Sequence, residues 1–398
     1  MSQLPSFFLS VGEPSGDLLG SELLKEMQKR LPHFHSFGIA GPCLRENPQF
    51  EALASIEDLS VMGFVEVIKH LRYIKRLEDR LLKIIEERKP AFAILVDYPG
   101  FHMRLAEFLR ARGVYVIQYV APQLWAWGEG RTKKLKEVTD LVVGIMPFEK
   151  EFFLDRSVNF AYAGTPQADR AARTLAQKYD FGWKSDVSLY GIFPGSRRGE
   201  VQRLLPLLRK TVDHILNNDE KAHCAISIAP ALAPEVFLPY FSELTGHEAK
   251  LNTDSDIHCG RVSFIKGRSL ALMSQVRSAV VTSGTATLEC ALVKTPLCIA
   301  YRMNKLSYQI AKRIISLENI SLVNLVAGKK IVREFIQEFS AIELAEELLA
   351  LATPGKYRSQ VLNNLNELDG QVSGDLARNG AKLIVETFLQ GNLNKTSE

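Results

Sequence analysis

Short apolar runs alternate along the chain with longer segments whose apolar residues recur at helical spacing. Continuous β-branched runs are typical of strands buried on both faces, and a helix between consecutive strands makes those strands parallel. The pattern therefore predicts an α/β fold with parallel sheets. We expect helices beyond residue 340, and strands at 7–11, 91–96, 114–120, 141–146, 160–163, 188–193, 222–229, 261–265, 279–282 and 297–301.

The length of 398 residues exceeds what a single hydrophobic core usually supports, so we expect more than one domain. The Gly-Thr-Pro segment at 164–169 is typical of a linker. We therefore place a first domain at 1–166 and a second at 167–355. Residues 356–398 are expected to form helices that pack back on the first domain or on a partner subunit, and a homodimer is one option.

The composition describes an ordinary globular protein, with 46% hydrophobic and 24% charged residues. A net charge of +4 is too small to predict a nucleic-acid partner. The five cysteines form no C-x-x-C pair, and the chain has neither a leader-like start nor an apolar run of 18 residues. We therefore expect a reduced, cytoplasmic protein without a membrane-spanning helix.

The run at 279–282 ends in a Ser-Gly-Thr turn, 283–285, and continues into a helix-forming segment. A strand that feeds a helix N-terminus presents free backbone N–H groups, which favour an anion together with the helix dipole. Glu289 follows one turn later on the same helix face, where it could accept ribose hydroxyls. A capping box fits poorly because Ala286 stands where Ser or Thr is needed. Such turns also occur without a nucleotide.

A second turn of this kind follows the strand at 188–193. Its glycine and Ser196 leave N–H groups free, and Arg197 adds a cation that suits a diphosphate. An arginine at a helix start opposes the helix dipole unless an anion is bound, although plain solvated charge is the common alternative. The turns at 194–200 and 283–289 are expected to face one ligand from the same sheet edge.

The first half of the chain also carries candidate groups at strand ends. The turn at 12–17 lacks the G-x-G-x-x-G spacing, and no G-x-x-x-x-G-K-[ST] loop occurs, which disfavours dinucleotide binding and ATP hydrolysis. This turn is either a plain strand-to-helix connection or part of a ligand cleft. Asp97 follows the strand at 91–96 and is well placed for chemistry, although a single Asp there is more often a turn former. Trp125 suits a sugar face, an acyl chain or the core.

The segment 60–83 interleaves apolar with basic residues. Separate apolar and basic faces suit a helix lying on an anionic membrane surface. The residues alone favour an ordinary helix with its apolar face on the core and a solvated basic face, because the periodicity is identical. The candidate membrane residues are Met62, Phe64, Ile68, Lys69, Arg72 and Arg76.

Six motifs occur in the order found in the lipid-A-disaccharide synthase family, which the chain resembles from about residue 5 to 390. They are GEPSGD at 12–17, MGFVEV at 62–67, PQLWAW at 122–127, PFEK at 147–150, PGSR at 194–197 and SGTATLE at 283–289, extended by 301–303, 324–328, Glu334 and Gln337. The resemblance implies the GT-B architecture, in which two Rossmann-like domains flank a cleft, and an inverting glycosyltransferase. Such enzymes join UDP-2,3-diacylglucosamine to 2,3-diacylglucosamine 1-phosphate and release UDP, at the cytoplasmic face of the inner membrane of Gram-negative bacteria.

The resemblance also implies roles for single residues. Asp97 would take the proton from the acceptor 6-hydroxyl, while Arg197 would stabilise the departing diphosphate. The expected donor-site residues are Ser196, Arg197, Ser283, Gly284, Thr285, Glu289, Arg302, Asn324, Glu334 and Gln337, and those of the acceptor cleft are Glu13, Ser15, Asp17 and Trp125. No metal or other cofactor is implied, since helix N-termini and basic side chains replace the cation and no D-x-D motif occurs. The same resemblance favours the membrane interpretation of 60–83, as a peripheral protein.

The chain departs from the family pattern at Gly100, His102, Thr165 and Val323, which bears on the finer geometry of the site and on acceptor or acyl-chain preference. Two alternatives stay open. One is a different UDP-sugar enzyme of the same architecture, such as an epimerase or a transferase with another acceptor. The other is a non-catalytic, membrane-associated protein that binds a UDP-sugar or a lipid.

Overall fold

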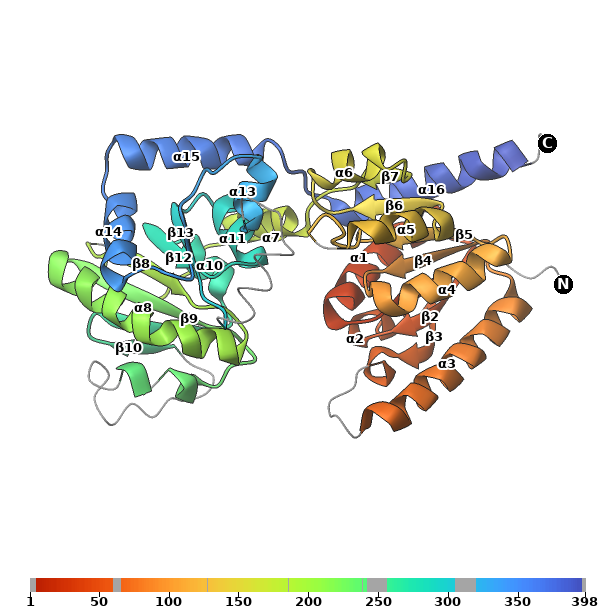
Figure 1. The fold of residues 1–398 in the computed structure, drawn as a ribbon, viewed down its shortest axis with the longest axis horizontal. Coiled ribbons are helices and arrows are strands. Elements are labelled where there is room, and N and C mark those ends of the chain that lie inside the picture. The colour runs from red at the N-terminus through yellow and green to blue at the C-terminus, as the bar shows by residue number, and fades with distance from the viewer. Residues whose placement is uncertain are drawn as a thin grey trace. The chain divides into compact units, whose positions relative to one another are not determined.

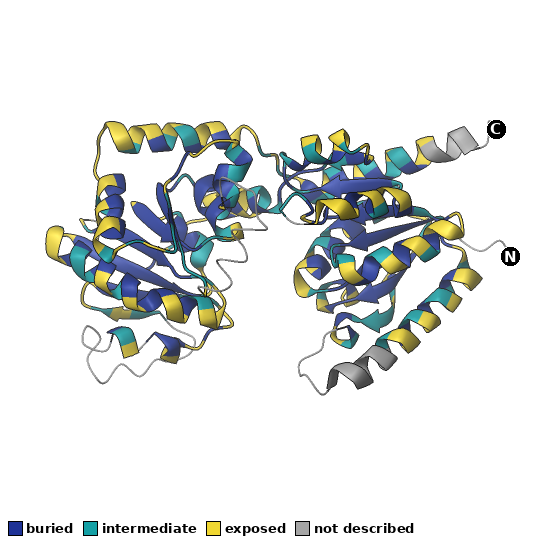
Figure 2. Ribbon diagram, viewed as in Figure 1, coloured by how far each residue is buried: buried dark blue, intermediate teal, exposed yellow. Residues whose placement is uncertain are grey.

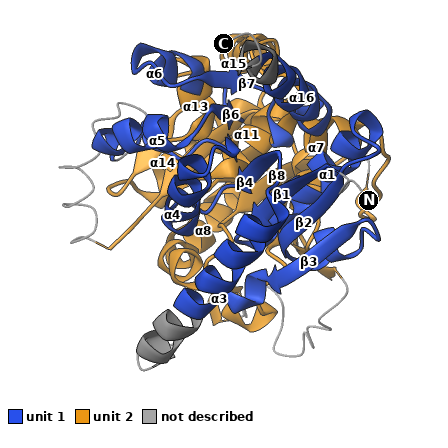
Figure 3. Cartoon of the chain, turned by 90° about the vertical axis from the view of Figure 1, so that its right-hand side faces the viewer, with its two compact units in different colours: residues 1–166, 375–398 blue, residues 167–374 orange. Residues whose placement is uncertain are grey.

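The computed structural model describes residues 5–59, 66–126, 128–184, 186–237, 239–241, 256–304 and 320–395, without the side chains of 66–73 and 391–395. The chain forms two compact units (Figures 1 and 3). Unit 1 comprises residues 1–166 and 375–398, and unit 2 comprises residues 167–374. The expected α/β fold is confirmed, because each unit is built on its own largely parallel sheet with helices on it.

Unit 1 holds a parallel sheet of seven described strands in the order β3-β2-β1-β4-β5-β6-β7. The order reverses between β1 and β4, and ligands of doubly wound sheets bind outside the carboxyl ends of such a pair. The strands are β1 (Ser6–Val11), β2 (His35–Ala40), β3 (Phe50–Ser55), β4 (Phe92–Val96), β5 (Tyr115–Tyr119), β6 (Leu141–Gly144) and β7 (Phe160–Tyr162).

Helices cover this sheet and bury its apolar side chains, so that the central strands are almost wholly buried, the edge strands β3 and β7 are only partly buried, and the helices expose their outer faces (Figure 2). The helices of unit 1 are α1 (Pro14–Arg30), α2 (Pro42–Arg45), α3 (Glu66–Arg88), α4 (Pro99–Ala111), α5 (Thr132–Val138), α6 (Glu149–Asp155) and α16 (Leu376–Lys395). The last helix returns to unit 1 from the C-terminus and packs on α1. Its Gly380 lets the helix lie close to β5, because a Cβ there would lie 2.7 Å from Cε2 of Tyr119.

Unit 2 repeats the arrangement with the described strand order β10-β11-β9-β8-β12-β13-β14, in which only the β10–β11 pair is antiparallel. Here the order reverses between β8 and β12. The strands are β8 (Ser188–Phe193), β9 (Ala222–Ile228), β10 (Ile257–Cys259), β11 (Val262–Lys266), β12 (Ser278–Val281), β13 (Leu297–Tyr301) and β14 (Glu334–Ile336). The strands predicted at 188–193 and 297–301 are confirmed to the residue.

The helices of unit 2 include two that pack across the sheet, α8 and α14, and a group that contacts α11 on the other side. They are α7 (Pro166–Leu175), α8 (Arg198–Asn218), α10 (Ser269–Met273), α11 (Thr285–Leu292), α13 (Leu322–Ala327), α14 (Ala341–Ala352) and α15 (Lys356–Asp369). The segment 356–398, for which we expect helices that pack on the first domain or on a partner subunit, contains two helices with different partners. The first, α15, packs on α11, α13 and α14 through buried Val361, Leu365 and Leu368, and only α16 belongs to unit 1.

The described side chains of α3 divide cleanly into two faces. Leu77, Leu81 and Ile85 recur at a spacing of four and are buried in the core of unit 1. Arg76 and Arg80 are exposed on the opposite face. Residues 74–88 are therefore an ordinary core-packed amphipathic helix with a solvated charged face, on which Asp79, Glu86 and Glu87 are exposed together with the basic residues. Met62 and Phe64 lie outside the described residues, as do the side chains of Ile68, Lys69 and Arg72.

Candidate functional site

A cavity of about 460 Å³ opens at the carboxyl ends of β8 and β12 in unit 2, where the strand order reverses. The two strands lead through short turns into α8 and α11. Five of the predicted donor residues line this cavity, namely Ser196, Arg197, Ser283, Gly284 and Thr285. The structure thus brings the turns at 194–200 and 283–289 together around one space.

The two turns are shaped by glycine. Gly195 has φ 103° and Gly284 has φ 144°, a region that L side chains rarely adopt. Gly284 is the N-cap of α11, and no side chain caps its first N–H groups. Arg197 is the N-cap of α8, with its side chain 81% exposed and its guanidinium donating to Glu200 over 3.1 Å. Free N–H groups at two helix starts, next to an exposed cation, form a site for an anion such as a diphosphate.

Glu289 does not line this cavity but forms an ion pair with Arg170 of α7, over 3.0 Å. The carboxylate is only 13% exposed, whereas the guanidinium is 44% exposed. Burial raises the pKa of Glu289, and Arg170 partly offsets this rise. Sequence reasoning missed Arg170, because nothing in the pattern of α7 indicates which helix it faces.

Asn324 and Glu334, both predicted for the donor site, form a buried hydrogen-bonded clasp at the start of β14. The Asn324 amide group donates to Glu334 Oε1 over 2.8 Å and to the Val332 carbonyl over 3.0 Å, while Asn324 Oδ1 accepts the N–H groups of Ile331 and Val332. Glu334 in turn accepts the N–H groups of Ile320 and Ser321. Through these contacts, both side chains hold the α13–β14 connection in shape. We name this set of contacts the Asn324 clasp.

Gln337 and Arg302 are also committed to internal contacts. The Gln337 side chain exchanges two hydrogen bonds of 3.1 Å with the backbone N–H and C=O of Met303. Arg302 donates to the Phe339 carbonyl over 2.6 Å and lies over the Phe339 ring. A link to the cavity exists at one point, since Ser283 Oγ donates to the Ile320 carbonyl over 3.5 Å, next to the Asn324 clasp.

In unit 1, Glu13 and Asp97 meet at the carboxyl ends of β1 and β4. The Glu13 carboxyl group is the neighbour whose hydrogen bonding and like charge act on the Asp97 carboxyl group. Burial and then the neighbouring Glu13 raise the pKa of Asp97 to about 6. The Ser15 hydroxyl donates to Glu13 Oε1 over 3.0 Å. A carboxyl group with this pKa can accept a proton near neutral pH.

The Asp97 turn is strained. Asp97 and Tyr98 both have left-handed backbones, with φ 51° and 49°, at a cost of about 1–2 kcal/mol for each such residue. The Tyr98 ring packs where a side chain on Gly12 would be, because a Cβ there would lie 2.2 Å from Cγ of Tyr98. The glycine of the turn at 12–17 therefore lets the two strand ends approach, and strain of this kind concentrates at functional sites.

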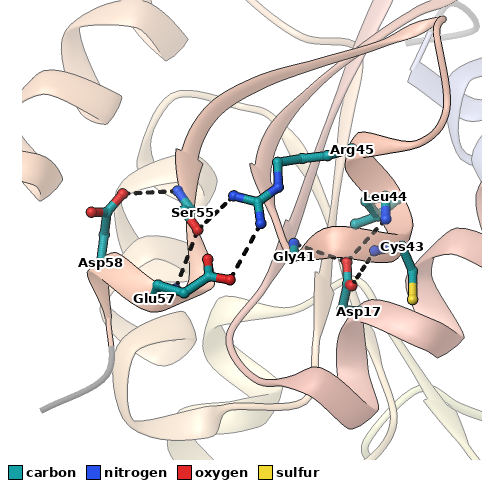
Figure 4. Close-up of polar contacts among 8 residues, drawn as sticks. All are labelled: Asp17, Gly41, Cys43, Leu44, Arg45, Ser55, Glu57 and Asp58. Atoms are coloured by element: carbon teal, nitrogen blue, oxygen red, sulfur yellow. Dashed lines mark hydrogen bonds and ion pairs between the residues drawn. The ribbon is translucent and has the colours of Figure 1, made fainter.

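Asp17 has a different environment from Glu13 and Ser15, although the three share one turn. Its carboxylate is 1% exposed and accepts the backbone N–H groups of Gly41, Cys43 and Leu44 at 2.9, 2.7 and 3.2 Å (Figure 4). It therefore holds the N-terminus of α2 and has no free oxygen for a ligand. Figure 4 shows the neighbouring support, in which Arg45 bonds Ser55 and Glu57 while Asp58 closes a capping box with Ser55.

Trp125 is half-buried, and its indole N–H donates to Glu149 over 3.3 Å. Glu149 is itself buried and accepts the N–H groups of Ile145 and Met146, while burial raises its pKa to about 7. The Trp125 ring meets Phe148 edge-on at 4.8 Å. Of the departures from the family pattern, Thr165 is buried and hydrogen-bonded to the Ile145 carbonyl, and Gly100 is exposed without close neighbours.

Solved structures define the class of fold. A glycosyltransferase from Rickettsia africae matches with a TM-score of 0.56 at 10% identity, over 98% of this chain and 99% of that one. The UDP-N-acetylglucosamine 2-epimerase from Neisseria meningitidis, bound to UDP-N-acetylglucosamine, matches with a TM-score of 0.54 at 12% identity, over 97% and 99%. The fold is therefore the GT-B architecture that such transferases and epimerases share.

Sequence comparison is more specific. The model of the lipid-A-disaccharide synthetase family matches residues 7–383. The lipid-A-disaccharide synthase of Trichlorobacter lovleyi is 36% identical over 367 residues, which span 91% of this chain and 92% of the relative. The chain belongs to the lipid-A-disaccharide synthetase family and is a glycosyltransferase of lipid A biosynthesis.

Proposed function

We propose that the chain transfers a 2,3-diacylglucosamine unit from UDP to the 6-hydroxyl of 2,3-diacylglucosamine 1-phosphate. The acceptor oxygen attacks the anomeric carbon, the bond from that carbon to UDP breaks, and inversion gives a β-1,6 linkage. The hydroxyl proton passes to Asp97 and the bonding electrons leave with UDP. The observation that carries the proposal is the cavity between the two turns at β8 and β12, whose donors suit the leaving diphosphate.

The roles follow from charge and position. Asp97 is the general base, because its raised pKa lets it take a proton and it lies at a strand end where ligands bind. Arg197 and the N–H groups at Ser196 and Gly284 stabilise the charge that develops on UDP. Glu289 binds the ribose, which requires the hydroxyls to replace Arg170 as its partner. Arg302, Asn324, Glu334 and Gln337 support the donor site by holding the loops beside Ser283 in place.

We also propose that the protein works on the cytoplasmic surface of the inner membrane as a peripheral protein. Both substrates carry acyl chains, and no helix in the described part of the chain is long and apolar enough to cross a bilayer. The exposed cations of α3, among them Arg76 and Arg80, would attract anionic headgroups. Met62, Phe64 and Ile68, which precede them, would enter the interface, and Trp125 would meet an acyl chain or a sugar.

The direct test is mass spectrometry of the product formed from the two purified diacylglucosamine substrates, with and without excess EDTA. We expect equimolar UDP and tetraacylated disaccharide 1-phosphate in both buffers, and none with Asp97→Asn. A parallel reaction with UDP-N-acetylglucosamine alone separates transfer from epimerisation. An epimer in that reaction, or UDP without disaccharide, would replace the proposed reaction with another one. Binding of both substrates without turnover would make the chain a binding protein.

A further inference from the structure

The carbonyl oxygen of Asp97 is the acceptor of two buried side-chain donors. Nδ1 of His102, on α4, lies 2.7 Å from it, and Nε2 of Gln118, on β5, lies 3.3 Å from it. His102 is 0% exposed and Gln118 is 1% exposed. A carbonyl oxygen can only accept, so Nδ1 of His102 carries a proton. Burial lowers the pKa of His102 to about 4, which leaves the ring neutral at pH 7 and Nε2 free to accept.

The second nitrogen of the ring ties in the neighbouring strand. Ser10 of β1 lies with its Oγ 2.9 Å from Nε2 of His102, and because that nitrogen accepts, the hydroxyl donates. Gln118 also bridges to the Val120 carbonyl over 3.2 Å, at a residue with φ 70°. The Asp97 carbonyl is thus joined to β1 through His102 and Ser10, and to β5 through Gln118.

These contacts act on a turn whose backbone is strained. Asp97 and Tyr98 are successive left-handed residues, and such a pair persists only when its surroundings fix it. Fixing the carbonyl of Asp97 also fixes the peptide plane that carries the Tyr98 N–H, and because the Asp97 carboxyl group accepts that N–H, its direction is fixed as well. We propose that His102, assisted by Gln118, is a positioning residue that holds the Asp97 carboxyl group in its reactive orientation. The proposal rests on the proposed role of Asp97 as the base.

The test compares His102→Leu with His102→Asn. Leucine fills the space and removes the donor, whereas the amide of asparagine can replace Nδ1 at the same distance from the backbone. We expect His102→Leu to lower kcat by about 10- to 100-fold, because small misplacements of a reacting group cost that much, with an unchanged KM for the UDP-sugar. His102→Asn should stay within a few-fold of wild type. The acid limb of kcat/KM should move to lower pH only in the leucine variant, since a released Asp97 leaves Glu13 and becomes more hydrated.

Three further variants separate positioning from general damage. Thr139→Val removes another buried hydrogen bond of unit 1, from Thr139 Oγ1 to the Leu135 carbonyl, and should leave kcat and the acid limb unchanged. Gln118→Met removes the second donor and replaces His102→Leu as the test if that variant does not fold; it should lower kcat in the same sense. Asp97→Asn reports on the base itself.

The outcomes are distinct. Wild-type turnover in Asp97→Asn would show that Asp97 is not the base. The positioning role of His102 would then be overturned with it. If Asp97→Asn is inactive but His102→Leu and Gln118→Met keep the wild-type kcat and acid limb, the positioning role alone is overturned. Equal loss of kcat in His102→Leu and His102→Asn would also overturn it, because the donor would then not be what matters.

Discussion

Nη2 of Arg170 lies 3.0 Å from Oε1 of Glu289, and this ion pair occupies the carboxylate that we propose for the ribose. Nucleotide binding therefore has a competitor within unit 2. Because the guanidinium is 44% exposed, the pair is expected to contribute no more than about 0.2–1 kcal/mol. An incoming ribose can displace it at small cost.

The first prediction follows from that competition. Glu289→Gln should weaken UDP binding, because the amide cannot accept both ribose hydroxyls as a carboxylate does. Arg170→Gln should leave the UDP affinity unchanged or raise it by up to about 5-fold, the equivalent of the pair's upper limit of about 1 kcal/mol. Calorimetric titration with UDP at pH 8 measures both. If Arg170→Gln weakens UDP as much as Glu289→Gln does, Arg170 orients the carboxylate and does not compete.

The second prediction concerns pH. With the pKa of Asp97 near 6, kcat/KM should fall about tenfold per pH unit below pH 6, since the base must be ionised. Glu13→Gln removes the neighbouring carboxyl that helps to raise this pKa, so its acid limb should move to lower pH. The measurement is kcat/KM from pH 4.5 to 8.5 for both proteins. An acid limb that stays in place in Glu13→Gln would contradict the pairing.

The raised pKa of Asp97 also makes stability depend on pH, in the direction opposite to activity: activity rises with pH, whereas stability falls. A carboxyl group whose pKa rises on folding stabilises the protein fully at low pH and loses that contribution as pH rises through about 6. Above pH 6 the ionised Asp97 therefore destabilises the folded state. Asp97→Asn should raise Tm at pH 8 and leave it nearly unchanged at pH 4.5, while it abolishes turnover. A lower Tm at pH 8 would mean that hydrogen bonds to the carboxylate, such as the one from the Tyr98 N–H, outweigh the cost of burying its charge.

The third prediction tests the anion site of unit 2. Arg197→Ala should weaken UDP binding by about 10- to 100-fold, because a charge-assisted hydrogen bond contributes about 1.5–3 kcal/mol. Arg198→Ala is the matched control, since Arg198 is also exposed but does not line the cavity. It should bind UDP like the wild type. Equal losses in both variants would indicate a diffuse basic field and no specific diphosphate contact.

Strands and turns could largely be predicted from the sequence, because a buried parallel strand needs a continuous apolar run. β2 escaped prediction for a physical reason. Gly38 interrupts its apolar pattern, and it must be glycine, because a Cβ there would lie 2.0 Å from the Leu9 carbonyl oxygen. β3 was missed as well, since its sequence Phe50–Ser55 mixes polar and small residues at the sheet edge.

The residues of the candidate site also fall into two groups, those that the sequence predicts and those that it does not. Residues in the two glycine turns could be predicted, because a turn between strand and helix fixes where its N–H groups point. Partners far apart in the sequence could not be predicted, since Arg170 of α7 meets Glu289 of α11, and Ser10 of β1 meets His102 of α4, only when the elements pack together. Asp17 and Asn324 show the limit most clearly. Both stand in motifs of the family, yet hydrogen bonds to backbone groups occupy their side chains.

The fourth prediction concerns the Asn324 clasp. Asn324→Leu leaves the N–H groups of Ile331 and Val332 without their buried acceptor, and each unsatisfied buried group costs about 1–3 kcal/mol. We expect a loss of about 3 kcal/mol in the free energy of unfolding of unit 2, equivalent to a Tm lowered by roughly 10 °C. Asn363→Leu, at an exposed position of α15, is the control and should change Tm little. A Tm within 2 °C of wild type, on a scale of about 2–4 °C per kcal/mol, would exclude the structural role.

The last prediction concerns the basic face of α3. Lys75, Arg76 and Arg80 are exposed on the face opposite the buried leucines. Each cation near an anionic bilayer contributes about 1 kcal/mol, which fades over a Debye length. Replacing all three by Gln should therefore weaken binding to phosphatidylglycerol vesicles by roughly 100-fold at low salt. In 0.5 M salt the variant and the wild type should bind alike.

The control for this experiment changes the net charge equally at another surface. Lys25 and Lys29 of α1 and Lys382 of α16 are exposed cations on two helices that pack together. Their replacement by Gln should leave vesicle binding near wild type if α3 is the membrane face, because only cations within a Debye length of the bilayer contribute. Because all six side chains are exposed, neither variant should unfold, and Tm checks this. Equal weakening by both triple variants would make the attraction a property of the net charge, and α3 would then be only a core-packed helix.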